Sequence, residues 1–151
     1  MKIVIGSDHA GFHLKEELKL WLQQSGYQVE DVGSHTPDPV DFPDIAFAVC
    51  SKIRANKKQR GLLVCGTGVG AVIAANKVKG IRAAVCHDAH SAHQSVEHDD
   101  VNVMCIGAQI VGSWLAQDLV STFLDATFVP DADLSRRVEK LSRLEELNWE
   151  E

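Results

Sequence analysis

The sequence has no long apolar run and no excess of basic residues. Its uninterrupted apolar stretches are far shorter than the roughly 18 to 20 residues that a membrane-spanning helix needs. The 15 Lys and Arg residues are outnumbered by 21 Asp and Glu residues, and the net charge of −6 disfavours nucleic acid and anionic lipid as partners. The first predicted strand begins at Lys2, and nothing ahead of it resembles the charged, apolar and small-residue regions of a signal peptide. We therefore expect a cytoplasmic protein that binds neither nucleic acid nor membranes.

Closely spaced cysteines are absent as well. Cys50, Cys65, Cys86 and Cys105 form no Cys-x-x-Cys pair, which disfavours a zinc site, a dithiol redox site and a disulfide framework. In a reducing compartment a cysteine is by default a small buried apolar residue. We expect this of three of the four cysteines, and Cys65 is the exception for the reason given below.

Short β-rich apolar runs alternate with longer stretches of helical period along the chain. Strands are predicted at residues 2–6, 27–32, 62–65, 81–86 and 101–106, and helices at 14–22, 45–53, 71–77, 89–96 and 112–124. This alternation is typical of βαβ units that form a parallel sheet covered on both faces. With 151 residues, of which 45% are hydrophobic, the chain suits one core. We predict a single α/β domain over residues 1–151, a Rossmann-like three-layer sandwich with a five-stranded parallel sheet.

A proline-rich segment over residues 33–43 interrupts the alternation after the second predicted strand. The fixed φ angles and missing amide donors of its prolines suit a surface loop. Asp44 is expected to cap the helix that follows. The basic residues Lys57, Lys58 and Arg60 are expected to form the solvated last turn of that helix, where cations interact favourably with the helix dipole.

A highly charged helix with one apolar stripe is predicted at about residues 133–148. The stripe consists of Leu134, Val138, Leu141, Leu144 and Leu147, which recur at helical spacing. Because this helix follows the last predicted strand, its stripe can pack on the parent domain or on a second copy. We expect a homodimer or homotetramer with this helix at the subunit interface.

Two loops at predicted strand ends contain the residues most suited to chemistry. In an open parallel sheet, ligands bind beyond the carboxyl ends of the strands. The first loop, over residues 6–11, places Asp8 and His9 at the end of the first strand. Taken singly, Asp8 suits a helix cap and His9 suits a hydrogen-bonded loop histidine. Because they are adjacent at a strand end, a functional site is favoured.

The second loop, over residues 65–71, has glycine at the alternate positions Gly66, Gly68 and Gly70. Such glycines let the backbone curl around an anion and direct its amides inward at the start of a helix. Cys65 is predicted to end its strand, where these amides and the helix dipole would favour its thiolate form. We expect a site for an oxyanion or phosphate, with a thiolate that acts as base or nucleophile.

Two other interpretations of this loop stay open. Gly66, Gly68 and Ala71 fit the permissive form of the dinucleotide-binding fingerprint, and Asp88 lies about 20 residues further on. That fingerprint ordinarily opens the first βαβ unit of a longer chain. The glycines also suit close packing between helix and strand without a ligand. On these interpretations the protein would be a nucleotide-binding or regulatory module, and Cys65 would be only structural.

Four histidines, at positions 87, 90, 93 and 98, lie close together in the sequence. If one helix carries His87, His90 and His93, each step of three residues is about 60° short of a full turn, and the side chains do not stack as an i, i+4 pair would. We therefore predict a polar helix face and no metal site. His98 differs, because it lies near the predicted helix end beside Asp99, where it can project into a neighbouring cleft.

Four segments occur in a recognisable order. They are Gly6-Ser-Asp-His-Ala-Gly11, Cys65-Gly-Thr-Gly-Val-Gly70, Ala74-Ala-Asn-Lys77 with Gly80-Ile-Arg82, and His98-Asp-Asp-Val-Asn-Val103. Together they resemble the type B ribose-5-phosphate isomerases, a family that includes galactose-6-phosphate and allose-6-phosphate isomerases. The similarity extends to about Gly112 and, more loosely, to Arg137 and the last predicted helix.

The resemblance implies an aldose–ketose isomerase that works through an enediolate without a metal or an organic cofactor. Cys65 is similar to the base that moves a proton between C1 and C2 of the opened sugar. The amides of Gly66, Gly68, Val69 and Gly70 would bind the enediolate oxygens, where negative charge develops.

The same resemblance implies three further catalytic residues. Thr67 would assist at the enediolate and in ring opening, and Asp8 would bind sugar hydroxyls or move protons between oxygens. His98 resembles the histidine that opens the furanose ring from the partner subunit, with Asp99 beside it as a substrate-binding residue. The active site would then be shared between two subunits.

For phosphate binding, the resemblance implies His9 together with several arginines. Arg137 matches one of these, with Arg136 beside it, but Gln109 and Asp133 occupy two other expected arginine positions. A carboxylate that faces a phosphate is repulsive. Ribose 5-phosphate and ribulose 5-phosphate remain the default substrate pair, and these departures leave a tetrose phosphate, a hexose phosphate or a free sugar as alternatives.

Overall fold

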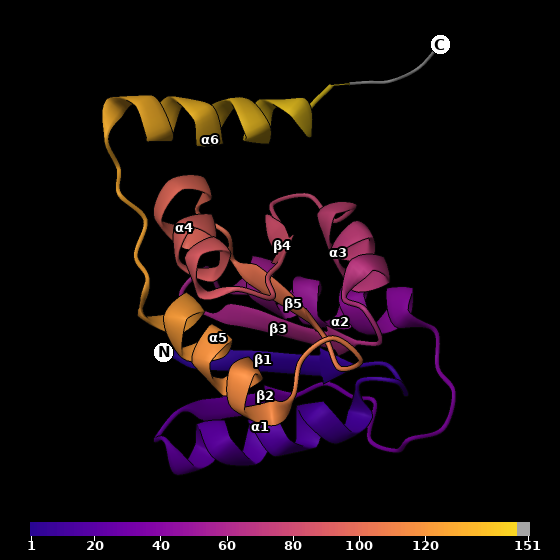
Figure 1. The fold of residues 1–151 in the computed structure, drawn as a ribbon. Coiled ribbons are helices and arrows are strands. Elements are labelled where there is room, and N and C mark those ends of the chain that lie inside the picture. Colours follow the sequence, from indigo (N-terminus) through magenta and orange to yellow (C-terminus); the bar gives the residue numbers. More distant parts are fainter. Residues whose placement is uncertain (148–151) are drawn as a thin grey trace.

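The computed structural model describes residues 1–147, and its centre is a parallel sheet of five strands (Figure 1). The strands are β1 (Lys2–Ser7), β2 (Gln28–Asp31), β3 (Arg60–Cys65), β4 (Ala83–Val85) and β5 (Val103–Gly107). Their order across the sheet is β2-β1-β3-β5-β4, and each neighbouring pair is parallel. The predicted five-stranded parallel sheet is confirmed, and every strand begins and ends within two residues of its predicted bounds.

Helices cover both faces of this sheet. One face packs against α1 (Phe12–Gln24), α4 (Ala89–Asp99) and α5 (Ser113–Asp125), and the other against α2 (Phe42–Ala55) and α3 (Val69–Asn76). The predicted three-layer α/β sandwich is therefore confirmed. No helix within residues 1–147 is both long enough and apolar enough to cross a membrane.

Side-chain alternation in β1 explains how one sheet supports two cores. Ile3 and Ile5 belong to the core beneath α1, α4 and α5, whereas Val4 between them belongs to the core beneath α2 and α3. All three side chains are fully buried. A strand that is apolar at successive positions can be buried only when both faces of its sheet are covered, as they are here.

The start of α2 differs from the prediction that Asp44 caps it. The N-cap is Asp41, and the Asp44 amide in the first turn donates to the Asp41 carbonyl oxygen at 3.2 Å. Pro43 occupies one of the first two helical positions. A proline is tolerated there because the first amides of a helix have no intrahelical acceptor. Pro43 therefore belongs to the helix and not to the preceding loop.

Lys57, Lys58 and Arg60 were predicted to form the solvated last turn of this helix, and this prediction is wrong. α2 ends at Ala55, and Arg60 is the first residue of β3. Its guanidinium donates to the carbonyl oxygens of Phe123 and Ala126, the latter at 2.6 Å. Carbonyl groups at the end of a helix lack intrahelical donors, so Arg60 satisfies the end of α5 from the neighbouring strand.

The helix α6 (Ala132–Leu144) lies outside the three layers, beside α4 (Figure 1). It begins after Asp131, whose carboxylate accepts a hydrogen bond from the Leu134 amide at 2.8 Å. α6 contains no buried residue, and Leu141 and Leu144 are 44% and 52% exposed. The predicted C-terminal helix is present, although its predicted end at residue 148 lies outside the described residues. Its apolar stripe is largely uncovered within the described part of one chain.

Candidate active site

The carboxyl ends of β1 and β3 lie side by side at the centre of the sheet. Ser7, the last residue of β1, is aligned with Val64 of β3. The chain passes from β1 to β2 on one side and from β3 to β4 and β5 on the other, so the strand order reverses between β1 and β3. Open α/β sheets bind ligands at such a switch point. The two loops predicted to contain the chemistry follow these two strands and meet there.

Asp8 holds the β1–α1 loop against β3. Its amide donates to the Val64 carbonyl oxygen at 3.3 Å, and its largely buried carboxylate accepts from the Gly11 amide at 3.0 Å. Gly11 permits this approach, because a β-carbon at that position would overlap the Val64 carbonyl group. Gly11 is the N-cap of α1, so the predicted helix-cap role of Asp8 is wrong, and its carboxylate instead organises the loop at the strand end.

His9 is exposed and is held by a segment far away in the sequence. Its Nδ1 accepts a hydrogen bond from the Val40 amide at 3.3 Å. In a neutral imidazole the accepting nitrogen has no proton, so this contact favours the tautomer with the proton on Nε2. His9 then offers an N–H donor on the side of the ring away from Val40, where it suits an anion or a sugar hydroxyl.

Cys65 is the last residue of β3, as predicted, and its sulfur is directed toward the glycine loop. Its Sγ accepts a hydrogen bond from the Gly68 amide at 3.0 Å. The side chain is 6% exposed and packs in the core beneath α2 and α3. The sulfur is thus mostly buried but in contact with the backbone that is expected to bind an anion.

The other three cysteines are at most 1% exposed, which confirms that they are small buried residues. Burial raises the pKa of Cys50 to about 12. It also raises the pKa of the Cys86 and Cys105 thiols. Thiolates are therefore disfavoured at all three positions.

The glycine loop enters α3 earlier than predicted. Val69 and Gly70, expected in the loop, form the first turn of α3, and Gly68 is the N-cap. Gly68 has a φ of +81°, and a β-carbon there would lie 2.8 Å from a Val85 methyl group. Glycine is therefore required by both conformation and space. The Thr67 hydroxyl accepts from the Val69 amide at 3.3 Å and lies on the exposed side of this turn.

His87 was predicted on a polar helix face, and this prediction is wrong. It follows the end of β4 and precedes α4, and it is only partly exposed. Its Nε2 accepts from the Gly107 amide at 2.9 Å, and Gly107 lies so close to Thr67 that a β-carbon would come within 2.7 Å of the Thr67 carbonyl carbon. His87 therefore supports the strand end on which Thr67 rests. Helical spacing missed this role because His87 is not in the helix.

Gln109 also reaches the glycine loop. Its backbone amide donates to the Gly66 carbonyl oxygen at 3.0 Å, and its side-chain amide lies 3.3 Å from a β-carbon built on Gly66. Gln109, at this expected arginine position, is therefore a neighbour of the glycine loop. It offers a neutral amide in place of a cation.

His98 and Asp99 lie at the opposite end of the sheet from Cys65. α4 runs back from the carboxyl end of β4, and both residues are in its last turn. The Arg82 side chain, just before β4, donates to the Asp99 carbonyl oxygen at 3.1 Å, which places this turn at the amino ends of the strands. Arg137 and Asp99 line the same cavity of about 580 Å³ between α4 and α6. Within one chain, the predicted site residues therefore form two groups at opposite ends of the sheet.

Arg136 and Asp133 pair with one another in the first turns of α6. The Arg136 guanidinium donates to the Asp133 carboxylate at 2.6 Å, and both side chains are exposed. This hydrogen bond and the charge of Arg136 lower the pKa of Asp133 below its usual value. The negative charge at an expected arginine position is therefore balanced within its own helix.

Within residues 1–147, no three His, Cys, Asp or Glu side chains are arranged to hold a metal ion. His93 instead lies 3.1 Å from the Glu97 carboxylate one helical turn away. The histidines of this region are thus distributed between a strand end, a helix surface and the last turn of α4.

Known proteins match nearly the whole chain. The sequence model of the family described as Ribose/Galactose Isomerase matches residues 3–141. The chain is 41% identical over 148 residues to D-erythrulose-4-phosphate isomerase 2 of Mycolicibacterium smegmatis, which covers 96% of this chain and 97% of that protein. It is 39% identical over 145 residues to ribose-5-phosphate isomerase B of Escherichia coli, again with 96% and 97% coverage.

The fold matches solved structures equally well. Ribose-5-phosphate isomerase B of Clostridium thermocellum has a TM-score of 0.93 at 44% identity, and the match covers 97% of this chain and 98% of that one. Agreement over this length, with the glycine loop after β3, displaces the alternative of a non-catalytic nucleotide-binding module. The chain therefore belongs to the ribose/galactose isomerase family and is an aldose–ketose isomerase.

Proposed function

We propose that this protein interconverts an aldose phosphate and its ketose through an enediolate, with Cys65 as the base. The observation that carries this proposal is the Cys65 sulfur, which faces the glycine loop and accepts from the Gly68 amide at 3.0 Å. In the forward direction the thiolate takes the proton from C2 of the open aldose and returns it to C1. The loop amides of Gly66, Val69 and Gly70, with Gly68, stabilise the charge on the enediolate oxygens.

The remaining proton moves between the two substrate oxygens. When C2 loses its proton, the C1 carbonyl oxygen must gain one and the C2 hydroxyl must lose one for the ketose to form. Asp8, at the end of β1, is the carboxylate proposed for this transfer, and the exposed hydroxyl of Thr67 assists at the enediolate. The isomerisation takes up or releases no net electron or proton, so the proposed steps need no redox cofactor.

A second subunit is proposed to complete the site. Within one chain, His98 and Cys65 lie at opposite ends of the sheet, which are separated by roughly 17 to 20 Å for strands of this length. A single small sugar does not span that distance, so His98 can act only at the Cys65 of another copy. The uncovered apolar stripe of α6 supports the same arrangement, because a partner surface would bury it. We propose a homodimer, alone or within a tetramer, in which His98 opens the sugar ring.

The terminal phosphate is proposed to lie between His9 of one subunit and Arg137 of the other, and Asp99 beside Arg137 is proposed to bind a sugar hydroxyl. His9 presents Nε2–H, and Arg137 lines a cavity shared with Asp99. Arg136 is paired with Asp133 and would have to exchange that partner to bind phosphate. Ribose 5-phosphate and ribulose 5-phosphate are the default pair.

A tetrose phosphate is the second candidate. Gln109 places a neutral amide against Gly66, and a relative at 41% identity is named a D-erythrulose-4-phosphate isomerase. A panel of tetroses, pentoses and hexoses, each with and without a terminal phosphate, tests both candidates by the appearance of the ketose. We expect activity only with phosphorylated aldoses. Faster turnover of a free sugar than of every phosphate ester would contradict the proposed phosphate site.

A further inference from the structure

Lys15 is a charged side chain with no exposed surface. It lies in the first turns of α1, and its amide donates to the Gly11 carbonyl oxygen at 2.9 Å. Its Nζ contacts both carboxylate oxygens of Asp31, at 2.8 and 3.0 Å, and Glu16 at 2.9 Å. Fully buried lysines are rare because an ammonium group loses its hydration. Charge pairing explains how Lys15 is tolerated but not why a lysine is placed there.

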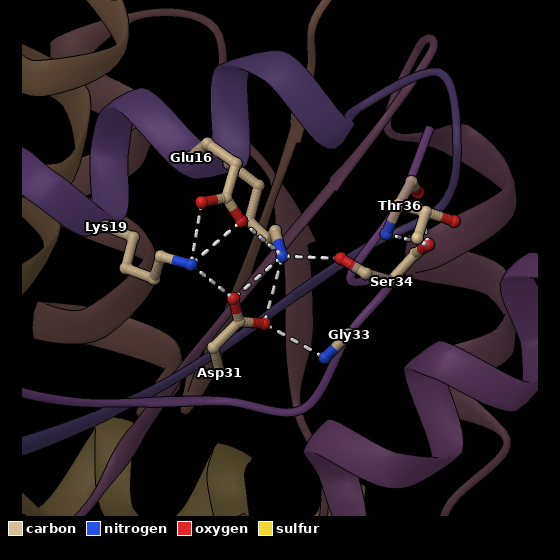
Figure 2. A network of polar contacts seen from close by, with 7 residues as sticks. Glu16, Lys19, Asp31, Gly33, Ser34 and Thr36 are labelled. Atoms are coloured by element: carbon tan, nitrogen blue, oxygen red, sulfur yellow. Dashed lines mark hydrogen bonds and ion pairs between the residues drawn. The ribbon is translucent and has the colours of Figure 1, made fainter. Parts of the chain in front are cut away.

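The third partner of Lys15 points to the reason. Its Nζ also donates to the backbone carbonyl oxygen of Ser34 at 2.6 Å. Figure 2 shows the carboxylates of Glu16 and Asp31 and the carbonyl of Ser34 converging on one ammonium group. The Asp31 carboxylate accepts in addition from the Gly33 amide at 2.9 Å. The buried ion pair therefore holds the backbone of residues 33–34 from two sides.

This held backbone is paired with the end of β1. The Ser7 amide donates to the Gly33 carbonyl oxygen at 2.8 Å, and the Ser34 amide donates to the Ser7 carbonyl oxygen at 2.7 Å. Ser7 is the residue immediately before Asp8. The position of Ser34 is therefore coupled directly to the strand end that begins the β1–α1 loop.

The same segment continues to His9 through a series of short-range hydrogen bonds. The Ser34 hydroxyl donates to the Thr36 carbonyl oxygen at 2.6 Å, and the Thr36 hydroxyl donates to the Asp38 carboxylate at 3.2 Å. Two residues after Asp38, the Val40 amide donates to Nδ1 of His9. Polar contacts thus run from the buried ammonium of Lys15 to Asp38, and two further residues of backbone lead to the Val40 amide that contacts the imidazole of His9.

We propose that Lys15 is a positioning residue for His9: it anchors Ser34, and the segment of residues 34–40 then fixes the ring orientation and the Nε2–H tautomer of His9. This inference rests on the proposed function for its kinetic consequence, which is tighter binding of the terminal phosphate. Its structural part, the tautomer of His9, does not depend on any activity.

Lys19 provides a matched control. It belongs to the same ion-pair cluster and contacts Asp31 at 2.8 Å and Glu16 at 2.7 Å, but it makes no hydrogen bond to Ser34 among the described residues. Lys15→Met and Lys19→Met each remove one positive charge next to Asp31. Only Lys15→Met removes the hydrogen bond that anchors Ser34.

The kinetic test is a double-mutant cycle with His9. We expect Lys15→Met to raise KM for the sugar phosphate roughly tenfold, as for coupled residues in one network, with a much smaller change in kcat. In a His9→Ala background the same substitution should leave KM nearly unchanged, because the residue it positions is gone. An equal KM effect in both backgrounds, or an equal effect of Lys19→Met, would overturn the inference.

The spectroscopic test follows the ¹⁵N resonances of His9, assigned by their loss in His9→Ala, at a pH at which the ring is neutral. We expect an unprotonated Nδ1 in the wild type and in Lys19→Met, and an average of both tautomers in Lys15→Met. Should Lys15→Met not fold, Val40→Pro removes the donor to His9 and leaves the ion pair intact, and we expect the same averaging. An unchanged tautomer in the folded variant overturns the inference, whereas a wild type without isomerase activity overturns only the proposed function.

Discussion

The sulfur of Cys65 accepts a hydrogen bond from the backbone amide of Gly68 at 3.0 Å. Gly68 is the N-cap of α3 and has a left-handed φ of +81°, so the donor is placed by a conformation that favours glycine at the start of a helix. Successive side chains of a strand point to opposite faces of the sheet. The contact therefore depends on the register of β3 as well as on the glycine.

Replacing Cys65 by alanine should abolish isomerisation and leave the fold intact. Loss of the base is expected to lower kcat by at least about 10²-fold. A small truncation at the end of a strand should change the free energy of unfolding by only about 1 kcal/mol. Cys50→Ala is the matched control, since Cys50 is buried in the same core but lies in α2. Ketose formation and denaturant unfolding are measured for both, and full activity of Cys65→Ala would refute its assignment as base.

Mixed subunits should restore activity if His98 acts at the partner's Cys65. Cys65→Ala and His98→Ala are each expected to be nearly inactive alone. A heterodimer of the two contains one intact site, because one subunit supplies Cys65 and the other supplies His98. Random exchange makes about half of the dimers mixed, and each mixed dimer has one intact site of two. About one quarter of the wild-type activity should therefore return if the sites act independently. Mass spectrometry verifies the exchange, and no recovery after verified exchange would exclude the shared site.

Acidification should weaken the contribution of Asp31 to stability. Burial alone would raise its pKa, but hydrogen bonds from Lys15 and Lys19 outweigh burial and hold the pKa of Asp31 below its usual 3.8. A depressed pKa contributes stability that is complete above the unfolded value and is lost as the pH falls through the folded value. Asp31→Asn should therefore cost roughly 3 to 5 kcal/mol at pH 7, as for a broken buried ion pair. The difference from wild type should shrink below pH 3.8, and a difference independent of pH would argue against this assignment.

Alkylation of the folded protein should modify Cys65 before the other cysteines. Cys65 is 6% exposed and faces the glycine loop, whereas the others are at most 1% exposed. The raised pKa of Cys50, about 12, leaves it almost entirely as the unreactive thiol near neutral pH. Peptide mass spectrometry after brief treatment with iodoacetamide gives the order of labelling. Addition of a sugar phosphate should slow labelling at Cys65, and equal labelling of Cys86 would contradict the proposed accessibility.

The two loops at the switch point could be predicted from the sequence because each depends on local pattern. An apolar run followed by Asp8 and His9, and another that ends at Cys65 before alternate glycines, indicate strand ends with polar or flexible residues beyond them. Parallel pairing then brings these ends to one edge of the sheet, whatever the details of packing. The βαβ pattern therefore predicts that both loops lie at the same edge of the sheet, whereas the adjacency of β1 and β3 depends on the strand order.

Residues whose roles depend on contacts between distant segments could not be predicted in this way. His87 contacts Gly107, 20 positions away, and Arg60 contacts the end of α5, more than 60 positions away. Neither contact leaves a periodic signal, because it depends on which strands are neighbours. The strand order, with β5 placed between β3 and β4, decides both.

The amino-acid sequence by itself determined the βα alternation, the burial of three cysteines and the presence of a thiol before a glycine-rich helix start, because each of these follows from side-chain type and local spacing. Only the tertiary structure decided that His98 lies at the opposite end of the sheet from Cys65 and that a fully buried Lys15 anchors the segment that holds His9. These relationships depend on the direction in which α4 returns across the sheet and on the pairing of Ser34 with Ser7, and both are properties of the packed chain as a whole.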